Sequence, residues 1–139
     1  MANSIKRLAR LDCTTLGDLI RAGIELGIAR LRLRSQEMTT LRARPPVKST
    51  MLDPGQTAKV ERVAFAIPRV AFYLPWRGDC LVQALAARRW LGHNGIATAL
   101  HLGVHKDLSV NFEAHAWLTA GDKVVTGGTI TEYIPLTQI

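Results

Sequence analysis

The amino-acid sequence predicts an α+β domain in which helices come first and an antiparallel sheet follows. Two observations support this class. Between residues 15 and 91, apolar side chains recur at helical spacing in segments separated by proline and glycine. From residue 98 to 126 the chain instead holds short strand-like segments, and the Gly121-Asp122 pair is typical of a tight hairpin. Helices followed in sequence by hairpin-connected strands are typical of α+β proteins.

The composition is that of a single globular domain. The chain has 139 residues, of which 47% are hydrophobic and 21% charged, so it can bury one core without cross-links. Its two cysteines, Cys13 and Cys80, lie in a polar leader and at a predicted helix start, and we expect no structural disulfide. The first residues show no signal peptide, and no apolar stretch is long enough to span a membrane. We therefore expect a cytoplasmic protein with no stable membrane insertion.

The net charge of +7, from 18 Lys and Arg against 11 Asp and Glu, permits binding to nucleic acid, anionic lipid or an acidic peptide. No nucleic-acid-binding motif or basic patch interleaved with aromatic residues supports the first option. We therefore expect no nucleic-acid partner. A solvated basic surface is the simplest interpretation of the charge.

The first helix is predicted to begin at Thr15, because Asp18 follows three residues later as in a capping box. An apolar face at helical spacing is formed by Leu16, Leu19, Ile20, Gly23, Ile24, Gly27, Ile28 and Leu31. We expect this face to pack inside the protein. Docking on a membrane surface or on a partner protein is the alternative.

Residues 35–55 are predicted to be a connector, since Pro45-Pro46 cannot continue a helix and Asp53-Pro54-Gly55 indicates a turn. A second helix is predicted over residues 56–73, kinked or split by Pro68. Its expected inward side chains are Val60, Val63, Ala64, Ile67, Val70 and Ala71. We therefore divide the single compact domain into an N-terminal helical extension with its linker, residues 1–55, and a core, residues 56–139.

Cys80 is the strongest candidate for a catalytic residue. Asp79 is a suitable N-cap, so Cys80 falls at the first position of a helix that runs to about Trp90. The positive end of the helix macrodipole favours a thiolate there. A thiol at the start of a helix is placed as a nucleophile should be.

His115 is the best candidate for the base that such a thiol needs. It lies in residues 111–119, whose side chains alternate between two faces, and it shares its face with Glu113 and Trp117. A nucleophile at a helix start and a base on a later strand form the layout of papain-like and transglutaminase-like cysteine enzymes.

The segments around these two residues resemble a known family. The matching blocks, in their order along the chain, are Trp76–Gln83, Gly103-Val104 and Phe112–Trp117. They resemble the leader peptidases of lasso-peptide biosynthesis, which are the second part of the lasso B protein. The resemblance covers residues 60–130.

The resemblance implies a transglutaminase-like, papain-like cysteine protease core, with Cys80 as nucleophile and His115 as general base. The implied reaction removes the leader from a ribosomally synthesised precursor peptide, after which a separate cyclase closes the lasso ring. The implied partners are the precursor and a separate leader-recognition protein, because residues 1–70 lack the β-rich winged-helix pattern of that recognition domain. The cyclase is a further candidate partner. No cofactor is expected, and nucleotide dependence is left open.

The third member of a catalytic triad is left open. Relatives place an Asp about a dozen residues after the histidine, but residues 124–129 contain no carboxylate. Asp122 is the nearest acid, yet at about 3.3 Å per residue a hairpin tip would lie roughly 17 Å from His115. Glu113, Thr126 and a backbone carbonyl are the other candidates.

Three other interpretations follow from the same residues. Without a third triad member, the chain could be a non-catalytic transglutaminase-like scaffold that binds a precursor peptide or a partner enzyme. Hydrolysis or acyl transfer on an unrelated amide is a second. A zinc site made by Cys80, His101, His105 and His115 is a third, but no C-x-x-C or helical H-x-x-x-H spacing supports it, so we expect no metal.

Overall fold

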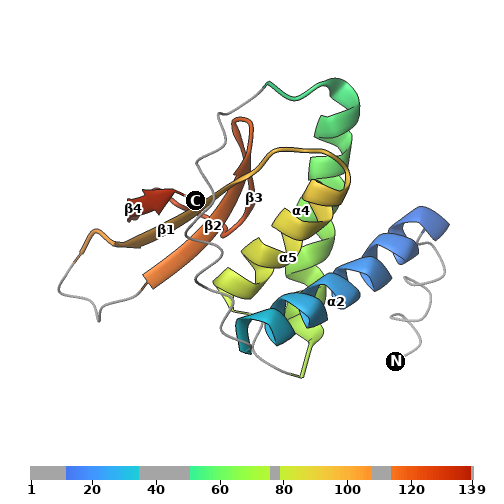
Figure 1. Cartoon of the computed structure of the whole chain (residues 1–139), viewed down its shortest axis with the longest axis horizontal. Coiled ribbons are helices and arrows are strands. Elements are labelled where there is room, and N and C mark those ends of the chain that lie inside the picture. The colour runs from blue at the N-terminus through green and yellow to red at the C-terminus, as the bar shows by residue number, and fades with distance from the viewer. Residues whose placement is uncertain (1–11, 35–50, 76–78, 108–113, 139) are drawn as a thin grey trace, which may run out of the picture.

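The computed structural model describes residues 12–34, 51–75, 79–107 and 114–138. Trp76 and Glu113, which the sequence singled out, lie outside these ranges. In the described part, three helices come first: α2 (Cys13–Arg34), α4 (Pro54–Tyr73) and α5 (Cys80–His93). The strands β1 (Ala99–His105), β2 (Ala114–Ala120), β3 (Lys123–Thr126) and β4 (Tyr133–Gln138) follow. The predicted α+β class is therefore confirmed (Figure 1).

The strands form one antiparallel sheet in the order β3-β2-β1-β4. The hairpin between β2 and β3 turns at Gly121, as the sequence predicted. The tail adds β4 as an edge strand beside β1. No helix in the described ranges is long and apolar enough to cross a membrane.

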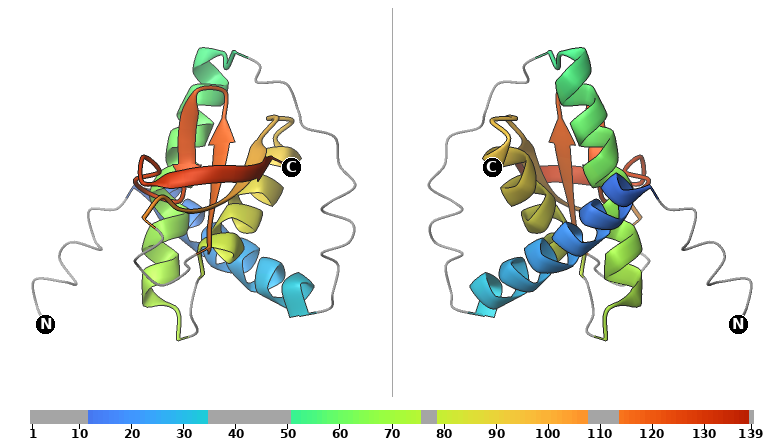
Figure 2. Two further views of the ribbon diagram at one scale, coloured as in Figure 1. Left: turned by 90° about the vertical axis from the view of Figure 1, so that its left-hand side faces the viewer. Right: turned by 90° about the vertical axis from the view of Figure 1, so that its right-hand side faces the viewer.

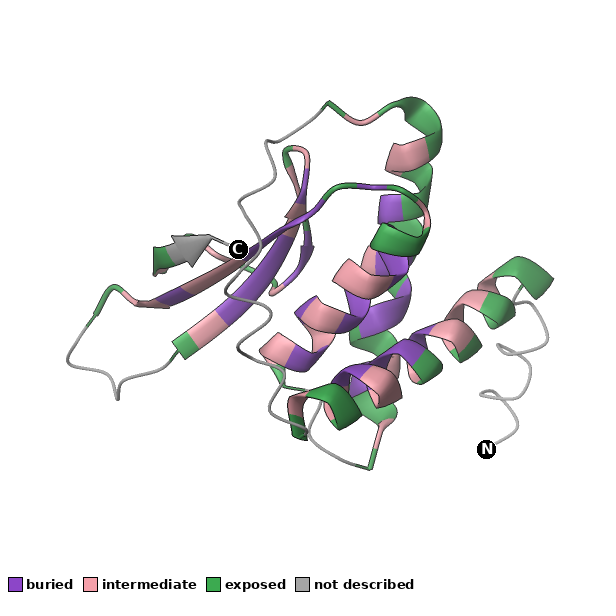
Figure 3. Ribbon diagram, viewed as in Figure 1, coloured by how far each residue is buried: buried purple, intermediate pink, exposed green. Residues whose placement is uncertain are grey.

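The helices form two layers on one side of the sheet. α4 and α5 pack against the strands, and α2 packs across α4 and α5 on the side away from the sheet (Figures 1 and 2). The largest fully buried side chains are Leu26, Ile67, Leu91, Leu100, Leu118, Val60 and Val63. One core therefore joins all three helices to the sheet (Figure 3).

The buried face of α2 is not the one that the sequence predicted. Leu16, Ile20, Ile24 and Leu31 of the expected inward stripe are exposed, Ile20 to 60%. The buried residues are instead Ala22, Glu25, Leu26 and Ala29. Small alanine side chains let α4 and α5 approach closely, and the carboxylate of Glu25 is tolerated there because arginines neutralise it. Apolar periodicity alone therefore selected the wrong side of this helix.

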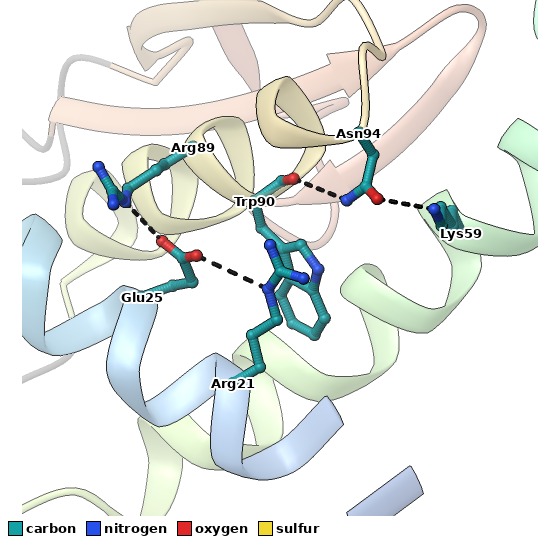
Figure 4. Close-up of polar contacts among 6 residues, drawn as sticks. All are labelled: Arg21, Glu25, Lys59, Arg89, Trp90 and Asn94. Atoms are coloured by element: carbon teal, nitrogen blue, oxygen red, sulfur yellow. Dashed lines mark hydrogen bonds and ion pairs between the residues drawn. The ribbon is translucent and has the colours of Figure 1, made fainter. Parts of the chain in front are cut away.

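Glu25 connects α2 to α5. Its carboxylate accepts a hydrogen bond from Arg89 Nε at 2.9 Å and lies 3.7 Å from Arg21 Nε (Figure 4). The Arg21 guanidinium in turn lies over the Trp90 ring of α5. A second link joins α5 to α4, where Asn94 accepts from Lys59 and donates to the Trp90 carbonyl (Figure 4).

The predicted capping box at Thr15 is also wrong. α2 begins at Cys13, so Thr15 already lies in its first turn. Asp18 does not cap the helix but accepts two hydrogen bonds from Arg62 of α4, from Nε and Nη2, each at 2.7 Å. A bidentate pair between two helices therefore outcompetes a local cap.

α4 begins two residues earlier than predicted. Asp53 is its N-cap and forms a capping box with Gln56, and Pro54 occupies the first turn, where a missing N–H costs nothing. The helix continues through Pro68 and is not split in two. Val60, Val63, Ile67 and Ala71 are buried as predicted, with Ala64 and Val70 partly buried. The proline lies on the exposed side.

Candidate active site

Cys80 is the first residue of α5, as predicted, and its free thiol is half-buried. Asp79 is the N-cap residue by position, but its side chain makes no capping hydrogen bond, contrary to the expectation for a short carboxylate. The N–H groups that open a helix have no partner within that helix. The Asp79 side chain therefore does not occupy these donors, and N–H groups at a helix start are suited to an anion.

His115 is the second residue of β2, and its half-buried ring is held on two sides. Its Nε2 atom lies 2.7 Å from the backbone oxygen of Gly127, which follows β3. The Tyr133 ring of β4 stacks on the imidazole, with ring centroids 4.4 Å apart and planes inclined by 28°.

β2 directs its side chains to the two faces of the sheet in alternation. Leu118 and Ala120 belong to the core that the sheet shares with the helices. His115, Trp117 and Thr119 consequently point to the other face. The predicted alternation of this strand is thus present, with the histidine on the face opposite the helices.

Trp117 is the centre of that other face. Its ring stacks on His101 of β1 at 5.3 Å, with planes 8° apart. A Cβ atom on Gly103 would come within 2.8 Å of the indole, so only glycine lets the large ring lie beneath β1. We call this surface the aromatic face; its members are His101, His105, His115, Trp117 and Tyr133.

His101 and His105 have partners of their own on the aromatic face. His101 Nε2 lies 2.9 Å from Thr119 Oγ1, and burial lowers the pKa of His101 because it disfavours the charged ring. His105 lies 3.4 Å from a carboxylate oxygen of Glu132 and packs against Tyr133. Within the described residues, no group of three or more His, Cys, Asp or Glu could hold a metal ion.

Cys80 and His115 lie on elements that pack together, since α5 covers β2. The first turn of α5 and the first residues of β2 lie at the same end of the molecule in both orientations (Figures 1 and 2). Among the described contacts, however, no hydrogen bond joins the Cys80 thiol to the His115 ring. α5 thus packs on the face of the sheet that carries Leu118 and Ala120, whereas the His115 ring lies on the opposite face, so the described structure does not place the thiol and the imidazole in contact.

The side-chain candidates for a third triad member do not reach the histidine. Asp122 is exposed in the hairpin turn, which lies at the far end of β2 from His115. Thr126 is buried, and its hydroxyl has no hydrogen-bond partner in the described structure. Glu113 lies outside the described residues. The observed partner of the ring is a backbone carbonyl, one of the alternatives that the sequence left open.

Sequence reasoning did not identify Gly127 or Tyr133 as neighbours of the histidine. A signal for Gly127 was present: the Gly127-Gly128 pair follows His115 by about a dozen residues, where the resemblance described above implies an Asp. Tyr133 had no such signal, because its position depends on how β4 pairs with β1.

The fold and its helix-start cysteine agree with the comparison to known families. The chain belongs to the transglutaminase-like superfamily, which it matches over residues 23–138. No curated protein and no solved structure matches it. This superfamily often contains cysteine peptidases and transglutaminases, and it fits the scaffold of a papain-like cysteine protease.

Proposed function

We propose that this protein is a cysteine peptidase with Cys80 as nucleophile and His115 as general base. The observation that carries the proposal is the thiol at the first position of α5, inside a transglutaminase-like domain, with helix N–H groups that Asp79 does not cap. The imidazole removes the thiol proton, and the sulfur attacks the carbonyl carbon of a peptide bond. The uncapped N–H groups stabilise the resulting oxyanion. His115 then protonates the departing amine, and water hydrolyses the thioester to restore the thiol.

This mechanism requires a rearrangement when substrate binds, because α5 and the His115 ring lie on opposite faces of the sheet and no described hydrogen bond joins the thiol to the imidazole. Catalytic hydrogen bonds are often long or absent in a free enzyme and form in the complex with substrate. We therefore expect a substrate peptide to increase the reactivity of Cys80.

We propose further that the substrate is the precursor of a lasso peptide and that the scissile bond joins its leader to its core. The resemblance of the segments around Cys80 and His115 to lasso leader peptidases supports this substrate class. A separate recognition protein presents the leader, and the cyclase that acts on the freed core is a further candidate partner.

The test of this proposal mixes purified protein with a full-length precursor, with and without the recognition partner, and follows cleavage by mass spectrometry. We expect cleavage only with the partner present and none with Cys80→Ala or Cys80→Ser. Cys13→Ala is the control and should cleave normally, since Cys13 is exposed at the start of α2. Substantial cleavage by Cys80→Ala would end the cysteine-peptidase proposal. Equal rates without the partner would locate leader binding within this chain.

A second candidate function is a non-catalytic scaffold that binds the precursor or a partner enzyme. The lack of a described hydrogen bond between Cys80 and His115 favours it. The two cysteines distinguish the candidates, because Cys13 is exposed whereas Cys80 is half-buried. Accessibility alone would make Cys13 react faster with a thiol reagent. With the precursor peptide present, faster labelling of Cys80, lost in His115→Ala, supports the enzyme, and faster labelling of Cys13 supports the scaffold.

A further inference from the structure

The contact between His115 and Gly127 defines which ring nitrogen carries the proton. Gly127 contributes a backbone oxygen, which has lone pairs and no hydrogen. At 2.7 Å from this oxygen, Nε2 must donate an N–H. A neutral imidazole carries one proton, so Nδ1 is left with the lone pair that can accept a proton from a thiol.

The His115 imidazole is restrained at its face as well as at the Nε2 edge that contacts Gly127. Tyr133 stacks on the imidazole at 4.4 Å, so a rotation that took Nε2 away from Gly127 would also break this stack. The tyrosine is itself fixed by the pairing of β4 with β1, in which it lies opposite His105. The bend that follows β3 and the strand β4 therefore both restrain the His115 side chain.

Gly127 needs to be glycine for the carbonyl to reach this position. Its φ of 107° lies in a region that other residues rarely adopt. A Cβ atom there would lie 2.3 Å from Trp117 Cβ, well inside any possible contact. Gly128 also has a positive φ, 63°, but a Cβ on it would meet nothing within 4 Å. Of these two adjacent glycines, only Gly127 is in close contact with Trp117.

From these contacts we infer that the Gly127 carbonyl takes the place of the orienting acid and, with Tyr133, holds His115 as the Nε2–H tautomer with Nδ1 as the basic atom. Gly127 and Tyr133 are positioning residues, and their catalytic importance rests on the proposed function. A neutral carbonyl orients the ring as an acid would, but it stabilises the imidazolium less than a carboxylate does. The proposed enzyme therefore works with a Cys-His dyad and an uncharged orienting group.

The decisive test is a long-range ¹H–¹⁵N NMR spectrum of the full chain labelled with ¹⁵N-histidine. Cys80→Ala is used so that the thiol does not compete for the ring, at a pH where the histidines are neutral. His115→Gln identifies the resonances of His115. We expect a protonated Nε2 and an unprotonated Nδ1. A predominant Nδ1–H form, or averaged shifts from exchange between both forms, would overturn the inference.

A reactivity test uses the adjacent glycines as a matched pair. In the presence of substrate peptide, we expect Gly127→Ala to slow alkylation of Cys80 at least about tenfold and Gly128→Ala less than about threefold. Tyr133→Phe should retain the rate because it keeps the stacked ring, whereas Tyr133→Leu should lower it. Equal effects of the two glycine variants would contradict the inference. If Gly127→Ala does not fold, the NMR spectrum still decides the tautomer.

The outcomes separate this inference from the proposed function. An Nε2–H tautomer in a protein that does not cleave would leave the positioning of the ring intact and refute the peptidase. Cleavage that depends on Cys80, together with an Nδ1–H tautomer, would retain the peptidase and refute the role of Gly127.

Discussion

Glu25 shows how a single ionic residue can decide the packing of a helix. It is only 4% exposed, and its carboxylate lies between Arg89 and Arg21. Taking a carboxylate out of water is costly unless it is paired and hydrogen-bonded. Glu25 meets this condition through the 2.9 Å contact with Arg89, so α2 can turn this side toward α5.

The first prediction concerns this pair. Arg89→Met should destabilise the protein by about 2–4 kcal/mol, because it leaves the buried carboxylate without its main partner. The double variant Arg89→Met with Glu25→Leu should recover most of the loss. Arg62→Met is the comparison, because Arg62 is largely exposed and its pair with Asp18 should contribute about 1 kcal/mol or less. Urea unfolding measures all three, and equal losses in the two single variants would contradict the argument.

The second prediction concerns pH. Burial lowers the pKa of His101 in the folded protein, so below the ordinary value of about 6.5 the unfolded chain binds more protons. The free energy of unfolding should therefore fall as the pH drops from about 6.5 to the folded pKa, and it should gain nothing from this group above that window. His101→Gln should flatten this part of the curve of unfolding free energy against pH. An unchanged curve would show that another group causes the dependence.

At the scale of the element, α2 and α5 differ in how well the sequence predicts them. α5 begins at Cys80, where the sequence indicates, although the Asp79 side chain does not cap it, and it ends at His93, followed by the C-cap Asn94 and by Gly95 with a positive φ. α2 has apolar side chains around most of its circumference, so periodicity could not identify the face that packs. Ala22 and Ala29 are buried because their small side chains let other helices approach closely. The sequence of α2 by itself does not show which of its faces another helix will approach.

The third prediction compares two large side chains of α2. Leu26→Ala should destabilise the protein by about 2–5 kcal/mol, because the side chain is fully buried. Ile24→Ala should change stability by less than about 0.5 kcal/mol, because that side chain is 57% exposed. Chemical denaturation of both variants gives the comparison. A larger loss of stability from Ile24→Ala than from Leu26→Ala would show that the apolar face predicted from periodicity is the one that packs inside.

The candidate site was predictable to a similar, limited extent. Cys80 and His115 carry local signals, a helix start and an alternating strand, and these suffice to nominate them. The contact of His115 with Gly127 depends on a bulged pairing between β2 and β3, where the register shifts beside Leu118. The hydrophobic alternation of the strands does not reveal such a register shift. The sequence could therefore name a backbone carbonyl as one alternative but could not identify Gly127.

At the scale of the whole molecule, α2 is part of the structure that supports the site. It contributes Ala22, Leu26 and Ala29 to the core and forms ion pairs with both α4 and α5. The superfamily match also begins within this helix, at residue 23. The division at residue 55 stays a prediction, and the packing allows a direct test of it.

The fourth prediction is that residues 51–139 alone do not fold cooperatively, because loss of α2 exposes the apolar sides of α4 and α5. Circular dichroism during thermal unfolding should show no sharp transition, in contrast to the full chain. Adding residues 12–34 as a separate peptide should restore part of the signal. A cooperative transition of the shorter chain by itself would show that α2 is an appendage.

The packing of Trp117 against Gly103 and Gly127 has an evolutionary consequence. A Cβ on Gly103 would meet the Ile134 backbone oxygen and the indole, and one on Gly127 would meet the Cβ and backbone of Trp117, so neither glycine can gain a side chain in this structure. Among relatives that share this backbone, positions 103 and 127 should therefore both be glycine whatever the size of the residue at 117. Because Gly127 also supports His115, a lineage that released this constraint would lose its carbonyl contact, and an acidic residue could then be selected nearby.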